Sequence, residues 1–190
     1  MIIHILCCLI MVDVCWFVLF AAHKKAGKIR PFLDEMCIEY FYPMSYQERQ
    51  NSHTGENKQV LYPILGNFIF VKSSKRTLDT LLKTVKLHLN LSSDLYYRDR
   101  GSRKIIIVPN EQMDNFIQVA SQKNEPILYL SNEEINLKQG DKVKIIDGVF
   151  KGVEGIFMRI KGSKRVVVAI PELFAVATAY LPTRFIQAIE

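Results

Sequence analysis

The chain has 190 residues, of which 49% are hydrophobic and 23% charged, and its formal net charge is +6. This length suits one ordinary domain or two small ones, and the composition excludes collagen-like repeats and wholesale disorder. The moderate positive charge permits a polyanionic partner without requiring one.

Asp13 is the only charged residue among the first 22, which are mostly apolar and long enough to cross a bilayer. No Lys or Arg precedes this run, as it would in a signal peptide, and Asp13 would lie deep in a membrane. Three interpretations stay open: a soluble buried strand, a membrane or export segment, and translation that begins at Met11. The aromatic run from Trp16 to Phe20 favours the strand, covered on both faces.

The cysteines all lie in the first fifth of the chain and form no CxxC pair. A disulfide framework would spread its cysteines across the fold, so we expect reduced thiols and a cytoplasmic location. No zinc-site spacing is present either, and we expect neither a metal nor a cofactor. These cysteines are Cys7, Cys8, Cys15 and Cys37.

The next elements alternate between helices and strands. Apolar residues at three- or four-residue spacing from Ala22 to Cys37 predict one buried helix face, with Pro31 near its first turn. A short strand is expected over 38–43, and the polar stretch 44–59 has no periodicity, which predicts a long exposed loop. Phe68 to Val71 is expected to form another core strand.

The second part of this region repeats the alternation. Leucines and a valine between Leu78 and Leu89 predict an amphipathic helix. Residues 96–104 resemble a basic hairpin turn, and residues 105–108 a strand. Asn110 is expected to cap a helix whose buried face is Met113, Phe116, Ile117 and Ala120.

Beyond about residue 130 the pattern is of strands only. Short β-rich runs separated by glycine-containing turns favour a closed small barrel. We therefore expect an α+β fold: an N-terminal α/β sandwich with an antiparallel sheet, followed by a small C-terminal barrel. The expected divisions are an apolar extension (1–13), the first domain (14–122), a linker with a short apolar anchor (123–136) and the barrel domain (137–190).

A run of glycines and alternating residues marks the start of the second domain. Val143 and Ile145 are expected to face inward while Lys142 and Lys144 face solvent, and the glycines permit tight turns and close backbone packing. The segment 140–155 resembles a KOW motif, and so implies an SH3-like barrel. The residues that carry the motif are Gly140, Asp141, Val143, Gly148, Phe150, Gly152 and Gly155.

The first domain makes the resemblance narrower. The opening Trp16-Phe17-Val18-Leu19, the strand that ends at Pro43 and the run 63–71 resemble the NGN domain of NusG-type elongation factors. The tail from Arg159 to Thr178 is similar to the UpxY branch, whose members promote transcription through capsular polysaccharide operons.

The resemblance implies binding without catalysis. An apolar face would dock on the clamp helices of the largest RNA polymerase subunit, and the matching positions are Phe17, Phe20, Leu65 and Phe68. Basic residues would contact the phosphates of non-template or upstream DNA, namely His23, Lys24, Lys25, Arg30, Arg98 and Arg100. The KOW domain would recruit a ribosomal or termination factor.

The sequence contains no GxGxxG, P-loop or HExxH pattern, so we expect no enzyme and no small-molecule substrate. We therefore expect a monomeric NusG-like antitermination factor. Two alternatives stay open: a ribosome-associated RNA-binding KOW protein, and a membrane-tethered binding protein anchored by residues 1–22.

Overall fold

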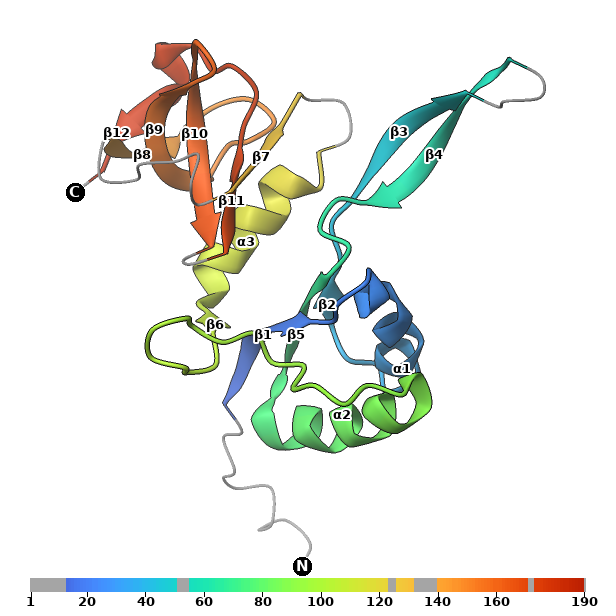
Figure 1. Ribbon diagram of the computed structural model, residues 1–190. Coiled ribbons are helices and arrows are strands. Elements are labelled where there is room, and N and C mark those ends of the chain that lie inside the picture. The colour runs from blue at the N-terminus through green and yellow to red at the C-terminus, as the bar shows by residue number, and fades with distance from the viewer. Residues whose placement is uncertain (1–12, 51–54, 123–125, 132–139, 171–172, 190) are drawn as a thin grey trace, which may run out of the picture.

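A computed structural model describes residues 13–50, 55–122, 126–131, 140–170 and 173–189, so the apolar extension lies outside the described residues except for Asp13. The fold is mixed α/β and combines antiparallel sheets with three α-helices in the described part of the chain (Figure 1). The first half contains β1 (Val14–Phe20), a 3-10 helix (Lys25–Ile29), α1 (Arg30–Glu35), β2 (Tyr40–Phe41), β3 (Met44–Gln50), β4 (Asn57–Pro63), β5 (Phe68–Ser74), α2 (Lys75–Leu89), β6 (Ile107–Val108) and α3 (Asn110–Ala120). The second half contains β7 (Leu128–Ser131), β8 (Asp141–Ile145), β9 (Glu154–Ile160), β10 (Ser163–Ile170), β11 (Phe174–Ala177), a 3-10 helix (Thr183–Phe185) and β12 (Ile186–Ala188).

The four-stranded sheet has the order β2-β5-β1-β6, which places β1 between two neighbours. Its residues Trp16 to Leu19 are buried, which confirms the predicted central strand. Successive side chains of a strand face opposite sides of the sheet. Phe17 and Leu19 accordingly pack against α1 and α2, whereas Trp16 and Val18 join the core around α3.

Helix α2 confirms the predicted amphipathic helix. The hydroxyl of Ser74 accepts a hydrogen bond from the backbone N–H of Thr77 at 3.1 Å, so it caps the first turn. The buried face is Leu78, Leu81, Leu82 and Val85. Helix α3 is confirmed as well, but it begins at Asn110 itself, so that Pro109 and not Asn110 is the N-cap. Its buried face is Met113, Phe116, Val119 and Ala120, with Val119 in place of the predicted Ile117, which is only partly buried.

Two expectations in the first half need correction. The helical spacing from Ala22 to Cys37 forms only a 3-10 helix and the short α1, with Ala22 and Cys37 exposed. Pro31 does lie in the first turn of α1, as predicted. Residues 44–59 are mostly not a loop, because β3 and β4 pair as a two-stranded ribbon. The ribbon was not predicted because its residues are mostly polar and lack the alternation of apolar and polar residues by which a strand is usually recognised.

The predicted closed barrel is wrong. The C-terminal strands form an open six-stranded sheet in the order β12-β8-β9-β10-β11-β7, and the two end strands do not pair with each other in the described chain. Strand β7 comes from the predicted linker and pairs along its length with β11. The expected linker is therefore, over its described part, largely an integral strand of the sheet.

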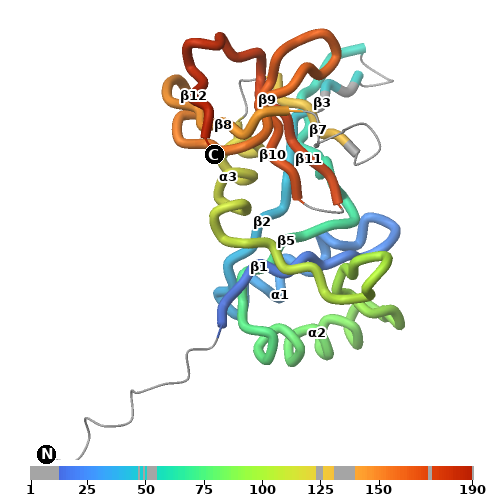
Figure 2. Tube along the Cα trace, turned by 90° about the vertical axis from the view of Figure 1, so that its left-hand side faces the viewer, coloured from blue at the N-terminus to red at the C-terminus, as the bar shows by residue number. Residues whose placement is uncertain are grey.

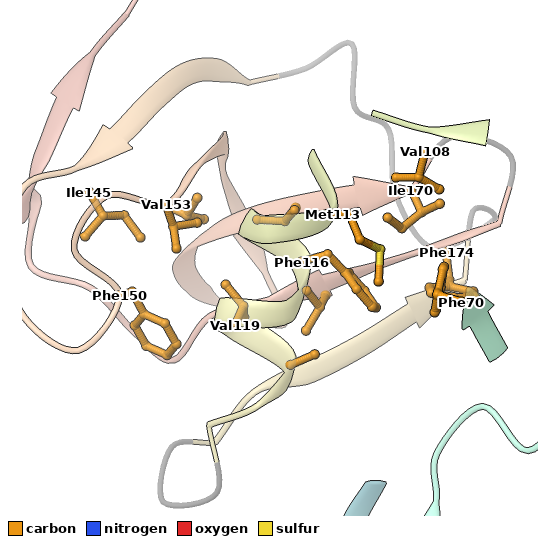
Figure 3. Close-up of a cluster of buried hydrophobic side chains, with 14 of the residues drawn as sticks. Phe70, Val108, Met113, Phe116, Val119, Ile145, Phe150, Val153, Ile170 and Phe174 are labelled. Atoms are coloured by element: carbon orange, nitrogen blue, oxygen red, sulfur yellow. The ribbon is translucent and has the colours of Figure 1, made fainter. Parts of the chain in front are cut away.

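Helix α3 joins the two sheets into one apolar core. Met113, Phe116 and Val119 on α3 are completely buried. They share a cluster with Phe70 from the first sheet and with Phe174 from the second (Figure 3). Figure 2 shows α3 running from the four-stranded sheet toward the six-stranded sheet. Helix α3 thus covers the core of the open sheet, whereas in a barrel the strands themselves would enclose the core.

Candidate functional site

Three partly exposed aromatic rings gather where β1 ends and β5 begins. The ring centroids of Phe20 and Phe68 lie 5.2 Å apart, and those of Phe68 and Tyr97 are also 5.2 Å apart. Phe20 and Tyr97 complete the triangle at 6.1 Å. We call these three residues, with the neighbouring Leu65, the aromatic patch.

The backbone fixes the positions of these rings. Phe20 and Phe68 are direct cross-strand partners in the antiparallel pairing of β1 with β5. The backbone N–H of Tyr97 donates to the carbonyl oxygen of Val18 at 2.8 Å, and that of Phe20 donates to Leu95 at 2.7 Å. The segment that carries Tyr97 therefore continues along the same side of β1 as β6, past the residues of β1 that pair with β6. Backbone hydrogen bonds thus hold the patch at the end of the sheet.

A basic loop follows Phe20 and lies against the segment 65–68. The backbone N–H of Lys24 donates to Asn67 Oδ1 at 2.7 Å, while that of Ala21 donates to the Asn67 carbonyl at 2.8 Å. His23 and Lys24 both adopt left-handed backbone conformations, with φ of 57° and 58°. Such conformations cost energy for residues other than glycine and often occur at binding sites. Asn67 therefore holds both ends of the loop that carries His23, at Ala21 and at Lys24, against the segment 65–68.

A second basic element, the arginine turn (residues 98–103), lies on another side of the patch. Asp99 shapes it, because its carboxylate accepts hydrogen bonds from Ser102, which hold the pKa of Asp99 below its usual value. Arg103 is left-handed, with φ of 60°. Arg98 also braces the turn, since its Nη1 donates to the carbonyl oxygen of Arg103 at 3.1 Å.

Arg98 differs from the other arginines because its charge is compensated. Its Nε and Nη2 both donate to Asp94 Oδ2, at 2.9 and 2.8 Å. Burial raises the pKa of Asp94, but the hydrogen bonds from Arg98 and from the backbone of Tyr96 outweigh it, so the net pKa is lowered. Arg98 is therefore a supporting residue. Arg100 and Arg103 are exposed and form no ion pair with any residue that the structure describes.

A cavity of about 520 Å³ opens between the aromatic patch and the arginine turn. Its volume lies in the range typical of small-ligand sites. Because Asp94 and Arg98 neutralise each other, the two positive charges of Arg100 and Arg103 dominate this cavity. It is lined by Phe20, Phe68, Asp94, Tyr96, Tyr97, Arg98, Arg100 and Arg103.

Two of the residues predicted from sequence lie elsewhere. Phe17 is only 2% exposed and packs edge-on against Tyr96 in the core beneath α2, so it cannot be part of an exposed docking face. Arg30 donates from Nε to the hydroxyl of Tyr40 at 3.2 Å, and its guanidinium lies 5.8 Å from the ring centroids of both Tyr40 and Tyr42. Its aromatic contacts are thus separate from the cavity.

The glycines of the predicted KOW segment have the backbone roles expected of them. Gly148 and Gly152 have φ of 82° and 95°, in turns where an L side chain is strained. Gly155 lies against the backbone of β10, where a Cβ would approach Val167 O to 2.6 Å. Val143 and Phe150 are buried in the core, while Gly140 and Asp141 lie at the exposed start of β8.

Tyr97, Asp94 and Asn67 belong to the site but were not predicted from the sequence. Tyr97 lies in an isolated bridge region without a strand-like run, so no periodicity distinguished it. Asn67 bonds to Ala21 and Lys24 in another segment, and sequence spacing does not reveal such partners. Asp94 pairs with Arg98 only four residues further on, but the segment is not a helix, so no helical spacing pointed to this pair. The predicted Phe20, Leu65, Phe68, His23, Lys24 and Arg100, by contrast, do fall around one end of the sheet.

No protein-family model matches the chain, and no curated protein matches it either. Among the described residues, none of the helices has the length and apolar character needed to cross a membrane.

Proposed function

We propose that this protein is a NusG-like transcription antitermination factor that binds RNA polymerase and promotes read-through of a long operon. One observation carries the proposal: a partly exposed aromatic patch lies between two basic loops at one end of a rigid sheet. An apolar patch with a cationic border suits a protein that must contact both an apolar helix surface and nucleic-acid phosphates.

The docking face in this proposal is Phe20, Leu65, Phe68 and Tyr97, without the buried Phe17. The clamp helices of the largest polymerase subunit would lie against these side chains. His23, Lys24, Lys25 and the arginine turn would contact the phosphates of the non-template strand or the upstream duplex. The similarity of the tail 159–178 to the UpxY branch favours a capsular polysaccharide operon as the target.

The proposal is tested by capture of bacterial core RNA polymerase on the immobilised full-length protein. Leu65→Asp places a charge in the docking face and is expected to reduce capture at least tenfold. Leu87→Asp is the matched control, because Leu87 is 81% exposed on α2, whose buried face packs on the side of the sheet opposite Phe68. Circular dichroism checks that both variants fold. Equal capture by the two variants would show that the docking face is wrong.

The same preparation distinguishes the alternatives. Co-purification with ribosomal RNA in the absence of polymerase would support a ribosome-associated KOW protein and would contradict the proposal. Recovery of the native protein only in the membrane fraction would support a tethered binding protein. Recovery with polymerase in the soluble fraction, lost on Leu65→Asp, is the result we expect.

A further inference from the structure

Strands β9 and β10 separate inside the six-stranded sheet. Their antiparallel ladder ends at the pair of Ile156 and Val167. Beyond this pair β9 stays with β8 through Gly155 and Glu154, whereas β10 stays with β11 as far as Ile170. The two strands therefore diverge, and we call the space between residues 154–156 and 167–169 the strand gap.

Two amide side chains of α3 take the place of the strand partners that are missing in the gap. Gln112 Nε2 donates to the carbonyl oxygen of Ala169 at 2.5 Å, and Asn115 Oδ1 accepts from the backbone N–H of Glu154 at 3.0 Å. The N–H and the C=O of one strand residue point to the same side. The Ala169 N–H and the Glu154 C=O therefore also face the gap, and neither has a ladder partner there in the part of the sheet that the structure describes.

A cavity of about 470 Å³ occupies the strand gap. Its apolar walls include Ile156 on β9, Val168 on β10 and Ile189 after β12. It thus combines apolar walls with one backbone donor and one backbone acceptor that lack strand partners. An extended peptide supplies the complementary acceptor and donor from its own backbone, and its side chains fill such a cavity, as in β-strand addition.

An acidic groove continues from this cavity along α3. A second hollow, of about 340 Å³, shares Glu111, Asn115 and Glu154 with the cavity and adds Asp114. Lys144 Nζ is bound to Glu154 Oε1 at 2.8 Å. Glu111 and Asp114 are exposed and form no ion pair with a residue in the described ranges. Because the chain as a whole carries a net charge of +6, this local negative charge favours a cationic ligand at this one place.

We infer that the strand gap binds an extended, basic segment of a partner polypeptide, which adds a short strand between β9 and β10. The backbone of this segment donates to the Glu154 carbonyl oxygen and accepts from the Ala169 N–H. One apolar side chain fills the cavity, and a neighbouring lysine or arginine reaches Glu111 and Asp114. The inference goes beyond the proposed function and does not depend on it, because the strand gap shares no residue with the docking face.

The probe is the fluorescent peptide Lys-Val-Thr-Val-Thr-Lys with blocked ends, and its binding to the full-length protein is measured by anisotropy. A lysine at each end allows either direction of the added strand. The same peptide with N-methyl groups on its four central residues cannot donate from them and should bind about 5- to 10-fold more weakly, as loss of a hydrogen bond does. Equal binding of these two peptides, or no binding of either at about 1 mM, would overturn the inference.

Charge-matched variants test the acidic groove. Glu111→Lys reverses an exposed charge in the groove and should weaken binding of the lysine peptide about 3- to 10-fold. Glu35→Lys makes the same change at an exposed position on α1, which packs on the side of the four-stranded sheet opposite α3, and should bind like the wild type. Equal weakening by the two variants would mean that only the net charge of the protein matters, and would overturn the groove as the site.

A second pair of variants tests the cavity. Ile189→Trp enlarges a partly exposed wall residue near the C-terminal strand and should prevent measurable binding. Ile146→Trp is the control, because Ile146 is 42% exposed and does not line the cavity. Circular dichroism checks that both variants fold. Unchanged binding by folded Ile189→Trp would show that the peptide binds elsewhere.

Hydrogen exchange measured by NMR locates the added strand. Saturation with the lysine peptide should slow exchange of the Ala169 amide at least about tenfold, because this N–H is then hydrogen-bonded. The amide of Gly162, in the exposed turn between β9 and β10, should exchange at an unchanged rate. Unchanged exchange at Ala169 in the saturated protein would overturn the inference even if the peptide binds.

Two further outcomes would assign the strand gap to another occupant. Dimerisation in sedimentation experiments that is lost in Ile189→Trp would make a second copy of the chain the occupant. Tighter binding of the peptide with glutamate in place of both lysines would overturn a basic partner. Polymerase capture separates this inference from the proposed function: Glu111→Lys should keep capture, and Leu65→Asp should keep peptide binding.

Discussion

The ring of Phe68 on β5 packs edge-on against the ring of Phe174 on β11, with their centroids 5.7 Å apart. Phe174 also contacts Phe70 and Phe116, at centroid distances of 5.9 and 5.7 Å. One side chain thus links the first sheet, the helix α3 and the second sheet. The two halves of the chain are therefore not independent units joined by a linker. Phe68, a residue of the proposed docking face, is in direct contact with the C-terminal sheet.

Phe174→Ala is expected to lower the free energy of unfolding by about 3–5 kcal/mol, because it leaves a cavity at the junction of three elements. Chemical denaturation followed by circular dichroism measures the change. Tyr180→Ala is the control, since its ring is largely exposed and its loss should cost much less. Similar losses for the two variants would contradict a core shared by both halves.

The fragment 137–190 is expected not to form the six-stranded sheet on its own, because it lacks β7 and the buried face of α3. Its amide NMR spectrum should show little dispersion. A fragment that begins at Pro109 restores both elements and should gain dispersed signals. A well-dispersed spectrum from 137–190 alone would favour the independent barrel expected from the sequence over the open sheet described above.

Elements whose residues follow a regular local pattern were predicted correctly from the sequence. The apolar run of β1, the leucine spacing of α2 and the glycine positions of the KOW segment all gave correct local structure. The β3–β4 ribbon was missed because few apolar residues alternate along it. The open sheet was missed because its core is covered by α3, which ends more than twenty residues before β8 begins. At the site, the strand residues Phe20 and Phe68 were predicted, whereas Tyr97 required knowledge of which segment lies beside β1.

Gly155→Ala is expected to destabilise the protein by about 1–3 kcal/mol, as overpacking of a close contact does. The new methyl group would lie 2.6 Å from the carbonyl oxygen of Val167 and 2.8 Å from Val166 Cγ1, so β9 and β10 would have to separate. Thermal unfolding measures the loss. Gly101→Ala provides the control, because its nearest atom would be Asp99 Oδ1 at 3.6 Å. Equal melting temperatures for the two variants would contradict this packing.

Asp79 is expected to make a small contribution to stability that disappears in acid. Its carboxylate accepts hydrogen bonds from Lys75 Nζ at 2.6 Å and from the hydroxyl of Tyr96 at 2.8 Å. The bond from Lys75 is the main cause that lowers the pKa of Asp79 in the folded protein. Because folding favours the carboxylate, this contribution is present above about pH 4 and is lost as the pH falls through the lowered pKa.

Asp79→Asn should therefore be less stable than the wild type at neutral pH, by under about 1 kcal/mol because the pair is partly exposed. At a pH below the lowered pKa of Asp79 the two proteins should approach equal stability, since the protonated Asp79 is then as neutral as asparagine. Urea denaturation at the two pH values measures the difference. Lys75→Met removes the partner and should show the same pH dependence relative to the wild type. A difference for Asp79→Asn that is unchanged between the two pH values would mean that the carboxylate charge does not stabilise the fold.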